Sequence, residues 1–310
     1  MLTSFFGKSS PINYLLLSAL VTIGFFVNTF SEQAPPFSVE TLPQIIGVLL
    51  LSIFAMLLLD FIIRKNNVTL NNTYAVFIFT VFTFLAPQFY QSPLVLLSNV
   101  FLLLATRRIL SLNNEKNIEK KIFDAAIYIT LASMCYFWSI LFFLILFIAI
   151  VRKTSVIFRH FIIPFIGIIT VFVVATTFQF LINDSFNWFY EWLEPIDFSL
   201  HSYNDIKLLI PAFLFVCLAI WMGLYRFGKL KMLSKKEKPS AGTMLFIVII
   251  TLCITLASPQ KNGAELIFLF APIAMITTNY VEISPSKERS VFNEILLWCI
   301  VLIALTIHFL

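Results

Sequence analysis

The sequence predicts an all-α membrane protein, a polytopic bundle of transmembrane helices that forms one domain over residues 1–310 with no separate soluble domain. Two observations predict this class: 60% of the residues are hydrophobic and 12% are charged, with a mean hydropathy of +0.94, and the apolar residues form long runs. Such a chain has too little polar surface to cover a water-soluble globule. Its 36 Phe, 8 Gly and 4 Cys also exclude disordered, collagen-like and disulfide-rich proteins.

Eleven apolar runs are candidate spans, because a helix needs roughly 20 apolar residues to cross about 30 Å of hydrocarbon. The runs are residues 12–30, 42–63, 73–90, 93–106, 122–137, 138–151, 161–182, 207–225, 242–258, 264–281 and 292–310. Two pairs of runs, 73–106 and 122–151, are short, and each predicts either two full crossings or a re-entrant hairpin of half-helices. The number of full crossings is therefore eleven, nine or seven, depending on how many of the two pairs are re-entrant. Each pair begins and ends on the same side of the membrane in either case, so the orientation of the later spans does not change.

The basic residues set the predicted orientation. With the N-terminus in the cytoplasm, 19 of the 21 Lys and Arg residues fall on the cytoplasmic side, and only Lys207 and Lys261 fall outside. This distribution follows the positive-inside rule and places the C-terminus in the periplasm, as expected for a multi-pass protein of a bacterial inner membrane. The basic loops are expected to contact anionic membrane lipids, and no module for nucleic-acid binding accompanies them.

The interior of the predicted spans contains few residues that could carry out catalysis, ion transport or metal binding. No ionisable residue lies in the middle of a span, which counts against a proton-driven transporter, a pump or a voltage sensor. The four cysteines lie inside apolar runs, at spacings unlike those of a metal site or a disulfide framework. Packing of Phe and Leu is expected to hold the bundle, and buried polar residues such as Ser98 are expected to hydrogen-bond between helices. A Phe-rich wall would also suit a groove for a lipid tail.

The first outer loop, residues 31–41, carries two carboxylates and no basic residue. Glu32 or Glu40 could act as a general base or hold a divalent cation. The alternative interpretation is that both residues cap helix ends. Glu40 stands just before the second span, where the helix dipole favours a negative charge.

The large outer loop, residues 183–205, mixes acidic and aromatic residues. The spacing of Phe186, Phe189 and Trp192 predicts an amphipathic helix that lies in the membrane interface, with the acidic side chains facing water. A Glu/Asp/His metal site and a simple aromatic belt are the two interpretations of this loop. In the first interpretation, the candidate metal ligands are Glu191, Glu194, Asp197 and His201.

The third outer loop, residues 258–265, holds one of the two outer basic residues. Lys261 could receive the phosphate or pyrophosphate head of a lipid. It could equally pair with Glu265 four residues later, which is worth only about 0.2–0.5 kcal/mol on a helix surface.

The opening Phe5-Phe-Gly-Lys-Ser-Ser-Pro-Ile-Asn-Tyr14 resembles the start of an uncharacterised family of small polytopic inner-membrane proteins from Bacteroidota. More distantly, the middle of the chain resembles the polyprenyl-phosphate-sugar-dependent glycosyltransferases of the C superfamily, in which short paired spans follow one another. The segments that carry this similarity are FTFLAPQFYQSPLVLLSNVFLLLATRRIL, AAIYITLASMCYFWSILFFLILFIAIV and KNGAELIFLFAPIAMITTNYVE.

The glycosyltransferase resemblance implies roles for three residues. Glu32 or Glu40 would be the catalytic base or the ligand of a divalent cation, and Lys261 would contact the lipid phosphate. The chain departs from that superfamily because its first outer loop is far shorter, has no Asp-x-Asp pair and is not followed by a soluble outer domain. These departures put catalysis in question more than architecture.

Two hypotheses of function follow from the sequence. The first is a protein of glycosyltransferase-C-like architecture that handles or transfers a polyprenyl-phosphate-linked sugar at the periplasmic face. The second is a non-catalytic membrane subunit or scaffold of an envelope-assembly, secretion or motility complex. The first predicts a bound polyprenyl phosphate, and the second predicts a membrane-protein partner.

Overall fold

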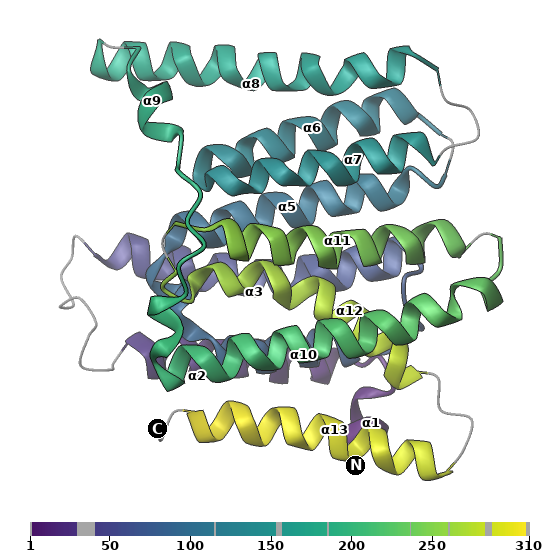
Figure 1. Ribbon diagram of the computed structural model, residues 1–310. Coiled ribbons are helices and arrows are strands. Elements are labelled where there is room, and N and C mark those ends of the chain that lie inside the picture. Colours follow the sequence, from purple (N-terminus) through teal and green to yellow (C-terminus); the bar gives the residue numbers. More distant parts are fainter. Residues whose placement is uncertain are drawn as a thin grey trace.

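The computed structural model describes residues 2–29, 41–114, 116–152, 157–184, 186–235, 237–259, 261–282 and 287–307 (Figure 1). Within these ranges the chain forms helices and loops and contains no strand, which confirms the all-α class. The short helices are α1 (Leu2–Phe6), η1 (Pro87–Gln91), η2 (Phe137–Leu141), α9 (Trp188–Trp192), η3 (His201–Asn204), η4 (Leu230–Met232) and η5 (Ala264–Leu266).

Each of the eleven apolar runs coincides with a longer helix. These helices are α2 (Pro11–Thr29), α3 (Leu42–Asn66), α4 (Tyr74–Leu85), α5 (Pro93–Ser111), α6 (Ile118–Cys135), α7 (Phe142–Val151), α8 (Arg159–Asn183), α10 (Ile206–Lys229), α11 (Lys238–Ala257), α12 (Ile267–Glu282) and α13 (Lys287–Thr306). Among the described residues, seven helices are long and apolar enough to cross a membrane. The protein is therefore a helical, multi-pass membrane protein.

Proline and local backbone geometry break the short pairs. Helix α4 stops at Leu85 because Pro87 disfavours the helical conformation at Ala86, whose φ is −135° and ψ 77°. The chain then turns through η1, and α5 begins at Pro93, a first-turn position that needs no backbone N–H. With 12 residues at about 1.5 Å each, α4 is only about 18 Å long. Helix α4 by itself is therefore too short to cross the hydrocarbon core.

The second short pair turns at Tyr136, whose backbone is extended, with φ −153° and ψ 106°. Helices α6 and α7 leave this turn side by side with α5 (Figure 1). The Ser98 hydroxyl on α5 lies 2.7 Å from the Ser139 hydroxyl and donates to the carbonyl of Ala132. The expectation that Ser98 bonds between helices is confirmed, and this bond ties the two hairpins together.

Helix α12 is the centre of the bundle. Every residue from Ile267 to Val281 is buried, and the helix contacts α4, α5, α10 and α11. Phe270 anchors an aromatic cluster, with its ring centroid 5.4 Å from that of Phe215 and 5.8 Å from those of Phe82 and Phe89. The predicted role of Phe packing is thus seen in the core.

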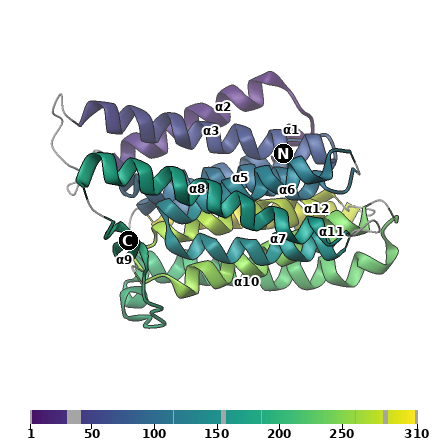
Figure 2. The ribbon, with the colours of Figure 1, turned by 90° about the horizontal axis from the view of Figure 1, so that it is seen from above.

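Helix α8 lies at the periphery, packed mainly on α6 (Figures 1 and 2). Its contact with α6 is close at Gly167, where an added Cβ would stand 2.7 Å from the Cβ of Ala126. The rest of its surface is apolar and exposed, as in Phe178 and Leu181. An apolar surface of this kind faces lipid in a membrane protein.

The long helices run roughly along one direction, so their connections gather at two ends (Figures 1 and 2). We call one the acidic end; among the described residues it holds the turns at 86–92 and 136–141 and the loop segments 186–205, 258–259 and 261–263. The opposite, basic end holds the described loop segments 64–73, 111–114, 116–118, 226–235 and 237–238. This segregation of loops agrees with the alternation of charge that the sequence predicts.

Candidate functional site at the acidic end

A cavity of about 300 Å³ opens at the acidic end, where four segments meet. Its wall consists of Ser92, Pro93, Leu94 and Val95 from the start of α5, Cys135 and Tyr136 from the turn after α6, Glu194 from the large loop, and Pro259, Asn262 and Glu265 from the loop before α12. These segments lie far apart in the sequence. The cavity therefore exists only in the folded protein.

Glu265 is the most buried acid of this cavity, with 1% of its surface exposed. It stands in η5, directly after a turn at Gly263 whose φ of +89° suits glycine. The phenol of Tyr203 donates a hydrogen bond of 2.6 Å to its Oε1, whereas its Oε2 makes no hydrogen bond. Burial raises the pKa of Tyr203, so this phenol keeps its proton and serves as a donor. One oxygen of Glu265 therefore remains available to a ligand.

Glu194 reaches the same cavity from the loop after α9. Trp192 holds this loop in place by donating from Nε1 to the carbonyl of Ser133 at 2.6 Å, and its ring packs on Phe137 and Phe172 at centroid distances of 5.0 and 5.3 Å. The Oε2 atom of Glu194 is buried and makes no hydrogen bond. Partial burial raises the pKa of Glu194. The expectation that this acid faces water is therefore wrong.

The loop differs from the predicted amphipathic helix in length but keeps its aromatic face. Its aromatic segment is helical over Trp188–Trp192, and the separate short helix η3 follows at His201–Asn204. Phe189 and Trp192 both pack on Phe172 of α8, while Phe186 stacks on Phe180 at a centroid distance of 4.9 Å. The aromatic residues thus face α8 and carry the following acid towards the cavity.

Lys261 is buried, with 5% of its surface exposed, and its ammonium donates to the backbone carbonyl of Asp197. It does not line the cavity. Its charge acts on Glu265, but the phenol of Tyr203 takes the hydrogen bond to that carboxylate. In the described structure Lys261 therefore anchors the large loop over the cavity.

The other predicted site residues are not gathered here. Glu32 and Glu40 lie in residues 30–40, outside the described part of the chain. His201 lies in η3 and Glu191 lines a separate groove. In the part of the chain that the structure describes, no group of three or more His, Cys, Asp or Glu side chains could hold a metal ion. The cavity thus offers two carboxylates and no complete set of protein ligands.

An apolar groove of about 680 Å³ adjoins the cavity. Trp192 and the end of α6 separate the two hollows, since Met134 lines the groove and Cys135 lines the cavity. The groove lies between α6, α8 and α9, and its wall is formed by Ile127, Leu131, Met134, Thr170, Val171, Val174, Ala175, Phe178, Gln179, Trp188, Glu191 and Trp192. An acyl or prenyl chain matches a surface of this composition.

Sequence reasoning missed the pairing of Glu194 with Glu265. The sequence predicts Glu194 as a water-facing acid of the large loop and Glu265 as a possible partner of Lys261, with no relation between the two. A usable signal was the turn Asn262-Gly263-Ala264 just before Glu265, where the Asn262 side chain accepts from the Ala264 N–H at 3.1 Å. Nothing in the spacing, however, relates residue 194 to residue 265.

Comparison with known proteins gives a family but no activity. No curated protein and no solved structure matches the chain. A family model described as a family of unknown function, DUF6427, matches residues 9–310, which is nearly the whole sequence. The chain therefore belongs to this family of unknown function.

Proposed function

We propose that the protein binds a polyprenyl-phosphate-linked sugar at the outer face of a bacterial inner membrane and transfers the sugar to an acceptor. The observation that carries this proposal is the juxtaposition of Glu194 and Glu265, each with a buried unbonded oxygen, in one cavity beside an apolar groove. The groove suits the prenyl tail, and the cavity suits the polar head. The orientation that the basic loops predict supports a position outside the cytoplasm for both the groove and the cavity.

The two carboxylates suit different roles in this reaction. Mg²⁺ is commonly held by one or two carboxylates together with substrate phosphates and waters, so Glu265 and the lipid phosphate would share a divalent cation. Glu194, with its raised pKa, would accept the proton of the acceptor hydroxyl. The hydroxyl oxygen then bonds to the anomeric carbon, the bond from that carbon to the phosphate oxygen breaks, and polyprenyl phosphate leaves.

The residues that the resemblance implies keep a place in the proposal. Glu32 and Glu40 belong to the first outer loop and remain candidates for the base or for a further ligand of the cation. Lys261 lies next to the cavity wall through Asn262, and its charge favours an anionic head group nearby.

The test uses the full chain in nanodiscs that contain a polyprenyl-phosphate sugar, with sugar transfer followed by mass spectrometry. Glu194→Gln and Glu265→Gln are expected to reduce transfer at least about a hundredfold, the usual contribution of a general acid or base. Asp184→Asn is the control, because Asp184 is an exposed acid at the same end that lines neither the cavity nor the groove. Transfer in the parent should rise with pH through a midpoint above 4.5, the ordinary pKa of a glutamate.

Unchanged transfer in both cavity variants would overturn the assignment of the site. Absence of any bound or transferred polyprenyl sugar in the parent protein would overturn the function itself.

A second candidate function is a scaffold subunit in a membrane complex, and peripheral α8 favours it. Only five of the 25 residues of α8 are buried, namely His160, Ile163, Pro164, Gly167 and Val171. A stoichiometric partner that crosslinks to the exposed face of α8, in a preparation free of polyprenyl lipid, would favour this function over the first.

A further inference from the structure

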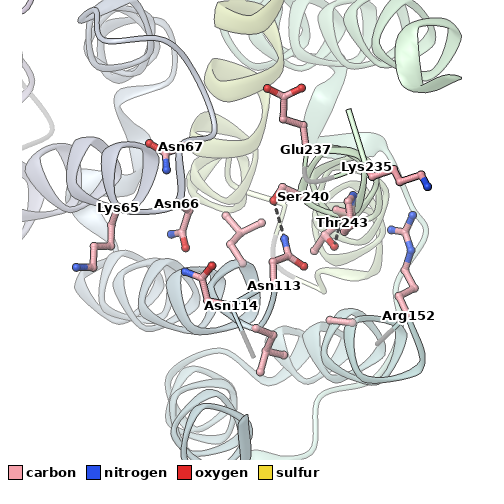
Figure 3. A pocket seen from close by; sticks show the side chains of 14 residues that line it. Lys65, Asn66, Asn67, Asn113, Asn114, Arg152, Lys235, Glu237, Ser240 and Thr243 are labelled. Atoms are coloured by element: carbon pink, nitrogen blue, oxygen red, sulfur yellow. Dashed lines mark hydrogen bonds between the residues drawn. The ribbon is translucent and has the colours of Figure 1, made fainter. Parts of the chain in front are cut away.

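A second polar cavity, seen from close by in Figure 3, lies at the basic end, whereas the cavity with the two carboxylates lies at the acidic end. Its volume is about 590 Å³, within the range of small-molecule sites. The ends of α3, α5 and α7 and the start of α11 enclose it. Its wall is formed by Lys65, Asn66, Asn67, Leu110, Leu112, Asn113, Asn114, Ala149, Arg152, Lys235, Glu237, Pro239, Ser240 and Thr243.

The wall carries three cations and one acid. Figure 3 shows Arg152 and Lys235 on one side of the cavity and Lys65 on the other, with the amides of Asn113 and Asn114 between them. Glu237 is the single acidic residue of the wall. The cavity therefore combines excess positive charge with neutral hydrogen-bond donors, a composition that suits an anion.

The cations of this wall have no carboxylate partner among the described residues, in contrast to three arginines at the same end. Among the described residues, Lys65, Arg152 and Lys235 form no ion pair. Three neighbouring arginines are each neutralised by a carboxylate, namely Arg64 by Asp60 at 2.7 Å, Arg108 by Asp124 at 2.9 Å, and Arg159 by Glu119.

The fold positions Arg152 in particular. Its guanidinium lies against α11 at Gly242, where an added Cβ would collide with it, and 5.8 Å from the ring centroid of Phe246. Guanidinium is planar and can form two parallel hydrogen bonds to a phosphate. Glycine at position 242 thus makes room for an anion-binding group at the wall.

The helix ends around the cavity also favour an anion. The ammonium of Lys121 covers the carbonyls of Ser111 and Asn114 at 2.6 and 2.7 Å, which offsets the negative end of α5. The first turn of α11 contributes Ser240, whose hydroxyl accepts from the Asn113 amide at 2.6 Å. This bond joins the two helix ends across the floor of the cavity.

We propose that this cavity binds a phosphate-bearing anion through Arg152, Lys235 and Lys65. Its size exceeds the needs of a lone phosphate, so a diphosphate or a phosphorylated lipid head group is the chemical class expected. Basic pockets between membrane helices on the cytoplasmic side bind lipid head groups in this way. The proposal goes beyond the function proposed for the acidic end and does not depend on it.

The test compares two probes on the full chain. Sodium pyrophosphate is titrated into detergent-solubilised protein by calorimetry, and phosphatidylglycerol binding is measured in phosphatidylcholine nanodiscs of increasing phosphatidylglycerol content. The double variant Arg152→Gln/Lys235→Gln is expected to bind at least about tenfold more weakly, since each lost charge-assisted bond contributes to affinity. The matched control, Lys229→Gln/Lys231→Gln, removes the same charge outside the cavity and should bind like the parent.

If the double variant loses pyrophosphate binding, the ligand is a soluble anion. If it loses only phosphatidylglycerol binding, the ligand is a lipid head group. No saturable binding of either probe to the parent, or an equal loss in the control, overturns the proposal. If the double variant does not fold, the single variant Lys235→Gln provides the test, because it removes one exposed cation of the wall. Unchanged binding in that variant would also overturn it.

Discussion

At the scale of single residues, burial decides which polar groups can do chemistry. Glu265 is almost fully enclosed, yet only one of its two oxygens has a hydrogen-bond donor. Leaving a buried carboxylate oxygen unbonded is costly, so such an atom in a cavity marks a place where a ligand can compensate. By contrast, the ammonium of Lys261 already donates a hydrogen bond to the backbone carbonyl of Asp197.

Lys261 is expected to act as an anchor of the large loop. In Lys261→Met the carbonyl of Asp197 loses a charged donor, a bond of a kind that contributes about 1.5–3 kcal/mol. Amide hydrogen exchange in residues 193–203 should therefore become about tenfold faster or more. Lys207→Met is the control, since Lys207 is an exposed cation at the same end, and it should leave this exchange unchanged. Exchange unaltered in Lys261→Met would contradict the anchor.

At the scale of elements, helices α12 and α8 differ most in burial. Helix α12 is buried at every residue from Ile267 to Val281, whereas α8 touches the bundle along one narrow face. Small residues allow two membrane helices to approach closely, and Gly167 opposite Ala126 is such a point. The position of α8, and with it the apolar groove, depends on this contact.

Gly167→Ala should therefore loosen α8. The new methyl group would stand 2.7 Å from the Cβ of Ala126, and overpacking of this kind costs about 1–3 kcal/mol. The free energy of unfolding in mixed detergent micelles measures the effect. Gly223→Ala on α10 is the matched control, because an added Cβ there meets no atom within 4 Å, and it should be neutral or stabilising by up to about 1 kcal/mol. Equal effects in the two variants would count against the close contact.

At the scale of the whole molecule, the two ends carry different chemistry. One buried and one half-buried carboxylate beside an apolar groove lie at the acidic end, and cations without a carboxylate partner line a polar cavity at the basic end. A membrane enforces such polarity, since basic loops stay in the cytoplasm. The proposed reaction and the proposed anion site are then on opposite sides of the membrane.

Cysteine labelling tests this orientation. In a variant without the four native cysteines, Gln91→Cys at the acidic end should react with a membrane-impermeant maleimide in intact spheroplasts. Ser234→Cys at the basic end should react only after the membrane is permeabilised. The reverse pattern would show the opposite orientation, and reaction of both from outside would contradict a chain that crosses the membrane between them.

The sequence by itself determined the class, the position of the helices and the segregation of charge, because these depend on local hydropathy and on the cost of moving charge through lipid. The break between α4 and α5 is also a local effect, since Pro87 and Pro93 act through their own backbone. The tertiary structure decided which acids share a cavity. Glu194 and Glu265 meet only because Trp192 docks on Ser133 and Lys261 holds the loop, and such contacts between distant segments leave no periodic signal in a sequence.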